Sequence, residues 1–140
     1  MKNVKLLAFV LIVILSSVSC NGQANKREVT QTFSTSKVSV YYFHFTRRCA
    51  TCLAVEENAR NAVEALFPNG VKAGDYSFTS LNLDQASTKE IANKLGVGGQ
   101  AMIVVRGDKK LDITSAVWMA AHDPEKMKVE ITSGIEKVLF

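Results

Sequence analysis

The chain has 140 residues, a length typical of one domain, and a formal net charge of +4 at pH 7. Its first 19 residues contain two lysines and no acid, so the remainder has a net charge of +2. That excess is too small to favour a nucleic-acid partner, and we expect none. The basic pairs Arg47-Arg48 and Lys109-Lys110 are short and indicate solvated turns.

The amino terminus has the pattern of an export signal. Two lysines precede an apolar run of ten residues over 6–15, and small residues follow as far as Cys20. Spanning a bilayer takes about 20 apolar residues, so residues 1–19 predict a secretory signal peptide. The segment resembles a bacterial lipobox, with Ser17 where that motif usually has leucine. The alternative is ordinary cleavage nearby, with Cys20 discarded or left free.

The lipobox resemblance implies that Cys20 becomes the lipidated first residue of the mature protein. The protein would then be exported and anchored to a membrane of the bacterial cell envelope, facing the periplasm or the exterior. Residues 20–37 would supply the lipid-attachment cysteine and a polar tether, with a weak edge strand over 29–33. Of the three cysteines, Cys49 and Cys52 would remain as one pair in a compartment where disulfides persist.

A strand that leads into a helix is the main feature of the mature chain. Residues 38–45 are β-branched or aromatic almost throughout, which is typical of a central strand. The short polar turn 46–48 follows, and a helix is predicted to begin near Cys49. Its apolar positions share one face and are Cys52, Val55, Ala59, Val63 and Leu66. At a helix N-terminus, unpaired N–H groups and the macrodipole favour the reactive thiolate of Cys49.

The remaining elements follow in a regular order. The helix is predicted to end at Pro68-Asn69-Gly70, and residues 76–83 alternate as a second strand. A Ser87-x-x-Glu90 capping box predicts the start of a second helix that Gly96 ends. Residues 101–105 and 110–114 predict a hairpin. Asp123-Pro124 predicts the start of a last helix, whose apolar stripe is Met127, Ile131, Ile135 and Val138.

The strand, the turn, the Cys-x-x-Cys motif and the β-α-β-α-β-β-α order together resemble the thioredoxin superfamily. The resemblance covers residues 38–140 and implies an α/β fold with a central mixed sheet flanked by helices. It implies that Cys49 is the attacking thiolate and Cys52 the resolving thiol. The redox-active disulfide Cys49–Cys52 would be the reactive group, and we expect no other cofactor and no bound metal.

The chain departs from that family near the cysteines. Arg48 stands where thioredoxins usually carry tryptophan, and a cation there should favour the thiolate. The pair between the cysteines, Ala50-Thr51, matches neither the reducing nor the strongly oxidising members, so the redox direction stays open. Phe43 stands where thioredoxins bury a carboxylate. The adjacent His44 is predicted to be a packed core histidine on the opposite face of the strand.

The family's cis-proline is replaced by Ala101, which follows Gln100. Because a cis bond before a residue other than proline costs about 2.5–4 kcal/mol, we expect a trans bond and a reshaped site wall. By the resemblance, the residues that contact substrate are Arg48, Gln100 and Ala101.

Three functions are compatible with these residues. The first is a membrane-tethered extracytoplasmic thiol–disulfide oxidoreductase that acts on protein thiols or disulfides, with a membrane electron-transfer partner if it is a reductase. The second is a copper- or metal-binding thioredoxin-like protein whose two thiolates act with His44, Met102 or His122. The third is a non-catalytic thioredoxin-like binding module with a structural disulfide, for which Trp118 is a candidate contact.

Overall fold

The structure is a computed structural model that describes residues 36–140. The predicted signal peptide, the predicted lipidation of Cys20 and the predicted edge strand over 29–33 lie outside these residues. Within the described range, no helix combines the length and the apolar character needed to cross a membrane.

The described chain is an α/β fold built on a four-stranded mixed sheet, with strands in the order β2-β1-β3-β4. Strand β1 pairs in parallel with β2 and antiparallel with β3, and β3 pairs antiparallel with β4. The strands are β1 (Val38–His44), β2 (Tyr76–Asn82), β3 (Ala101–Arg106) and β4 (Lys109–Asp112). The helices are α2 (Ala50–Leu66), α3 (Pro68–Ala73), α4 (Ala86–Leu95), α5 (Thr114–Met119) and α6 (Pro124–Leu139).

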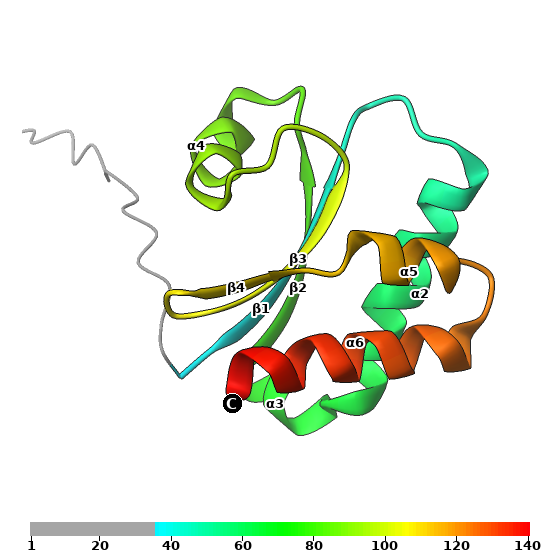
Figure 1. Cartoon of the computed structure of the whole chain (residues 1–140), viewed down its shortest axis with the longest axis vertical. Helices are drawn as coiled ribbons and strands as arrows, with labels where there is room; N and C mark the ends of the chain where they lie inside the picture. Colours follow the sequence, from blue (N-terminus) through cyan, green and yellow to red (C-terminus); the bar gives the residue numbers. More distant parts are fainter. Residues whose placement is uncertain (1–35) are drawn as a thin grey trace, which may run out of the picture. The chain divides into compact units, whose positions relative to one another are not determined.

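Helices cover both faces of the sheet (Figure 1). One face packs against α2, α5 and α6 in a core that includes Val40 and Tyr42 of β1. The opposite face packs against α4 in a second cluster that includes Phe43 and Ile103. Neighbouring residues of β1 therefore point to opposite faces, as strand geometry requires, and the strand is buried on both sides as predicted.

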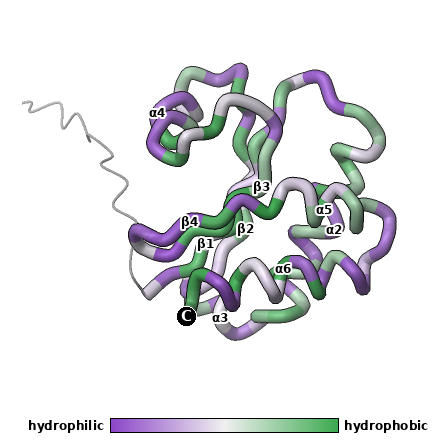
Figure 2. Tube along the Cα trace, viewed as in Figure 1, coloured by the Kyte–Doolittle hydropathy of each residue, from purple (hydrophilic) through white to green (hydrophobic). Residues whose placement is uncertain are grey.

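Polar residues mark the open edge of the sheet. The turn between β3 and β4 is hydrophilic, at the purple hairpin tip in Figure 2, and Lys109 and Lys110 are exposed there. Lys110 Nζ donates a hydrogen bond to the carbonyl of Leu95 at 3.0 Å. The basic pair therefore lies at an edge strand, and one of its members caps the C-terminal end of α4.

Three local expectations are corrected by the structure. Pro68 begins a further short helix, α3, as its first residue, in addition to following α2. The segment after the hairpin forms a further helix, α5, that was not predicted from the sequence. The prediction that Ser87 caps this helix is wrong, because α4 begins at Ala86 and its N-cap residue, Gln85, makes no side-chain cap hydrogen bond. The C-cap at Gly96 is confirmed, in the left-handed conformation.

A buried glycine allows α6 to lie close to the sheet. A Cβ atom on Gly134 would meet Cγ2 of Ile113 at 3.0 Å and Cγ2 of Val104 at 3.4 Å. We expect Gly134→Leu to lower the free energy of unfolding by about 1–3 kcal/mol, because overpacking outweighs the gain in helix propensity. Urea unfolding of the oxidised full chain measures this. Glu136→Leu, at an exposed position of the same helix, is the control; an equal loss there would contradict the explanation.

Candidate functional site

The two cysteines of the Cys-x-x-Cys motif form a disulfide at the start of α2. Cys49 is the N-cap residue, and its sulfur accepts a hydrogen bond from the backbone N–H of Cys52 at 3.1 Å. Cys49 is exposed, whereas Cys52 is buried with only 5% of its surface accessible. The first cysteine is therefore open to a partner and the second is covered.

Tyr42 anchors the first turn of α2, which carries the disulfide. Its buried hydroxyl donates a hydrogen bond to the backbone carbonyl of Cys52 at 3.0 Å, which ties the first turn of α2 to β1. The ring stacks on His44, with centroids 5.7 Å apart, and tilts against Trp118 at 5.9 Å. Burial raises the pKa of Tyr42 above its ordinary value, and the neighbouring Arg48 opposes that rise. The phenol is thus held neutral as a donor.

His44 is buried beside Tyr42, with 9% of its surface accessible. Its Nδ1 lies 2.8 Å from the carbonyl of Phe45, and because a carbonyl only accepts, Nδ1 carries the proton. The prediction of a packed histidine is confirmed. Phe43 lies in the cluster on the other face, as alternation predicted.

Arg48 folds back over the first turns of α2. Its guanidinium forms an ion pair with Glu56 and lies over the ring of Tyr42, with Cζ 5.6 Å from the centroid. Only 18% of the Arg48 side chain and 14% of the Glu56 side chain are exposed. The other carboxylate oxygen of Glu56 accepts from Arg60 at 2.9 Å. By contrast, Arg47 is exposed. The two adjacent arginines are therefore in different environments.

A second set of polar contacts fixes the loop before Cys49 to the end of β2. The Asp84 carboxylate accepts from the backbone N–H of Thr46 at 2.8 Å, and Asn82 donates to the Thr46 hydroxyl at 2.9 Å. The backbone and side-chain hydrogen bonds from Thr46 lower the pKa of Asp84 below its ordinary value. This clamp fixes the direction in which the loop leaves β1.

Gln100 and Ala101, two of the residues predicted to contact substrate, lie in different environments at the start of β3. The Gln100 amide donates to the Cys52 sulfur at 3.5 Å, so Gln100 contacts the disulfide. Ala101 instead packs in the cluster on the α4 side. No peptide bond within residues 36–140 is cis, so the predicted trans bond before Ala101 is confirmed.

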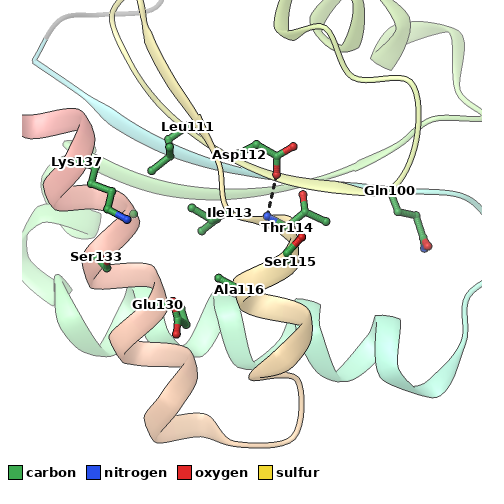
Figure 3. A pocket seen from close by; sticks show the side chains of 11 residues that line it. Gln100, Leu111, Asp112, Ile113, Thr114, Ser115, Ala116, Glu130, Ser133 and Lys137 are labelled. Atoms are coloured by element: carbon green, nitrogen blue, oxygen red, sulfur yellow. Dashed lines mark hydrogen bonds between the residues drawn. The ribbon is translucent and has the colours of Figure 1, made fainter.

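Two hollows meet at Gln100. One, of about 530 Å³, lies between β4, the start of α5 and α6, and Figure 3 shows Gln100 at one side of it, apart from the α6 residues. The other, of about 410 Å³, is lined by the glycine-rich loop before β3. Asp112 borders both, and it accepts from the backbone N–H of Thr114 at 2.8 Å.

The residues considered as metal ligands do not form a cluster. Met102 is fully buried in the core, and His122 is exposed in the turn before α6. Over residues 36–140, no group of three or more His, Cys, Asp or Glu side chains is placed to hold a metal ion.

Three residues around the disulfide were not predicted from the sequence: Tyr42, Glu56 and Asp84. Tyr42 shares the α2-facing side of β1, which the alternation of the strand could have indicated. Glu56 follows Cys52 by four residues, a spacing that places two side chains on one face of a helix. Asp84 is 38 residues from Thr46, and no local pattern points to that contact.

Comparisons with known proteins give no family. No family model matches the chain, and no curated protein matches its sequence. Among solved structures, it is similar to one described as "Structure of a malarial protein". That similarity has a TM-score of 0.44 and 14% sequence identity, and it covers 71% of this chain and 98% of the other. A similarity at that level carries no argument about fold or function.

The hydroxyl of Tyr42 can be tested by its removal. We expect Tyr42→Phe to lower the free energy of unfolding by about 1 kcal/mol, because the buried bond to the Cys52 carbonyl is lost. Urea unfolding of the oxidised full chain checks this. The control is Tyr76→Phe, at a half-buried tyrosine of β2 whose ring stacks on Phe67. Equal effects of the two variants would show that the Tyr42 bond contributes nothing.

The clamp at Asp84 predicts a dependence of stability on pH. Because the folded pKa of Asp84 lies below its ordinary value of 3.8, its ionised form stabilises the fold above that value. This contribution is lost as the pH falls through the folded pKa. We expect Asp84→Asn to have a lower urea midpoint than the parent at about pH 6, and the difference to shrink toward about pH 2. A difference independent of pH would exclude the charge as its cause. Asp108→Asn, which removes the same charge at an exposed position of the β3–β4 turn, is the control.

Proposed function

We propose that this protein is a thioredoxin-like thiol–disulfide oxidoreductase that acts on protein thiols or disulfides. The observation that carries the proposal is the disulfide at the N-terminus of α2, with Cys49 exposed and Cys52 buried. The four-stranded mixed sheet, with one parallel and two antiparallel pairings and helices on both faces, is compatible with a thioredoxin-like fold and supports the proposal. The export signal and Cys20 of the sequence support action outside the cytoplasm from a membrane tether.

The exchange takes place in two steps, each of which forms one S–S bond and breaks another. The Cys49 thiolate attacks one sulfur of a substrate disulfide; a mixed disulfide forms, the substrate S–S bond breaks and one substrate thiolate leaves. The Cys52 thiolate then attacks the Cys49 sulfur, the Cys49–Cys52 bond forms and the second substrate thiolate leaves. The substrate gains two electrons and the protein loses them. A thiol-bearing electron donor at the membrane would then reduce the Cys49–Cys52 disulfide again. The reverse sequence oxidises a substrate dithiol and leaves the protein reduced, so it requires a disulfide-bearing electron acceptor.

The residues around the disulfide fit these steps. The Cys52 N–H that donates to the Cys49 sulfur would stabilise the thiolate of the first step. Tyr42 holds the backbone of Cys52, which keeps the resolving sulfur within reach of Cys49. The Gln100 amide would stabilise negative charge on the Cys52 sulfur when the reverse reaction makes it the leaving group.

The proposal predicts a catalytic rather than a structural disulfide. We expect the full chain in mild detergent, with Cys20→Ser, to titrate against glutathione and dithiothreitol with a midpoint between about −120 and −270 mV. A midpoint below about −300 mV would indicate a structural disulfide and overturn the proposal. In the same background, Cys52→Ser should accumulate mixed disulfides with a model protein disulfide. Cys49→Ser is the matched control and should trap none.

A further inference from the structure

Arg48 precedes the reactive cysteine in the chain, yet its guanidinium forms an ion pair with the carboxylate of Glu56. The pair is largely covered, with 18% and 14% of the two side chains exposed. Charges removed from water interact strongly, because solvent screens them less. The Nε of Arg48 is buried without a hydrogen-bond partner among residues 36–140. Glu56 is therefore the group that balances the nearly buried cation of Arg48, the residue that precedes Cys49 in the chain.

Glu56 is itself held on both sides. One carboxylate oxygen pairs with Arg48, and the other accepts from Arg60 at 2.9 Å. Arg60 in turn lies over the ring of Phe78, with its Cζ 4.9 Å from the centroid. Both cations thus lie over aromatic rings that belong to the sheet. This arrangement fixes the Glu56 carboxylate and, through it, the direction of the Arg48 side chain.

A cation free to approach a thiolate would favour the ionised form and make the disulfide more oxidising. We propose that Glu56 is a positioning residue that keeps Arg48 paired and directed over Tyr42. Glu56 thereby limits how readily Cys49 ionises and keeps the dithiol more reducing than its basic loop would make it. This inference rests on the proposed function, because it assigns a regulator of the redox potential to the same site. It is tested separately, on the ionisation of Cys49.

The test compares two neighbouring carboxylates of α2. The full chain with Cys20→Ser is reduced, and iodoacetamide alkylation of Cys49 is followed by mass spectrometry across the pH range. We expect Glu56→Gln to shift the pH profile of Cys49 about one unit lower, because the freed guanidinium stabilises the thiolate. The equilibrium with glutathione should move toward the dithiol by roughly threefold to tenfold, the latter about 30 mV. Glu57→Gln, which removes the same charge at an exposed position, should shift the profile far less.

The role of Arg48 is isolated by repeating Glu56→Gln in an Arg48→Met background. The proposal requires the Glu56 effect to fall there to the size of the Glu57 control. An undiminished effect would mean that Glu56 acts on the sulfurs directly, and a Glu56→Gln shift no larger than that of the control would also overturn the proposal. The other titratable groups near the loop, Tyr42, His44, Arg47 and Asp84, stay unchanged in every variant.

Arg48→Met alone decides the matter if Glu56→Gln does not fold. We expect the alkylation rate of Cys49 below its pKa to change by less than about twofold, because Glu56 directs the guanidinium over Tyr42 and Arg60 still pairs with Glu56 in the variant. A fall of about tenfold would overturn the proposal, because Arg48 would then be stabilising the thiolate in the native protein. A midpoint typical of a structural disulfide would reject the proposed function and leave the ionisation result standing, so the two failures are distinguishable.

Discussion

The central position of β1 is the constraint on which the rest of the structure depends. Seven residues of this strand pair with β2 on one side, and six pair with β3 on the other. The carbonyl of His44, the last residue of β1, accepts a hydrogen bond from the N–H of Leu83 at 2.7 Å, so the strand is held in place along its whole length. The loop that follows is anchored again at Thr46. The short loop between β1 and Cys49 is therefore anchored by hydrogen bonds at His44 and at Thr46, which fixes the position of Cys49.

At the carboxyl end of β1, the side chains on its two faces make different kinds of contact. Phe43 joins the apolar cluster under α4, where it contributes only packing. Tyr42 faces α2 and carries a hydroxyl that reaches the carbonyl of Cys52. A buried hydroxyl needs a hydrogen-bond partner, and a helix carbonyl in the first turn supplies one without introducing a charge. The strand thus positions the cysteine pair through a neutral contact, and the charges lie on the loop and on α2.

Local patterns predicted the elements with strong periodicity and failed where tertiary contacts decide. β1, α2 and α6 carry many apolar residues in register, so their burial could be inferred from the sequence. The short helices α3 and α5 have six residues each, too few for a periodic signal. At α4, the Ser87 motif had the right spacing, yet the Thr88 N–H bonds to the backbone carbonyl of Gln85 and the helix begins earlier.

The environments of the charged residues at the site could not be predicted from the sequence either. The sequence places Arg47 and Arg48 side by side, and a count of charges gives both the same influence on Cys49. The fold separates them, because Arg47 remains in solvent whereas Arg48 turns onto Glu56 and the ring of Tyr42. A solvated cation acts through a high dielectric, and a paired one is cancelled by its partner. The electrostatic character of a basic loop therefore depends on which carboxylate the fold brings to it.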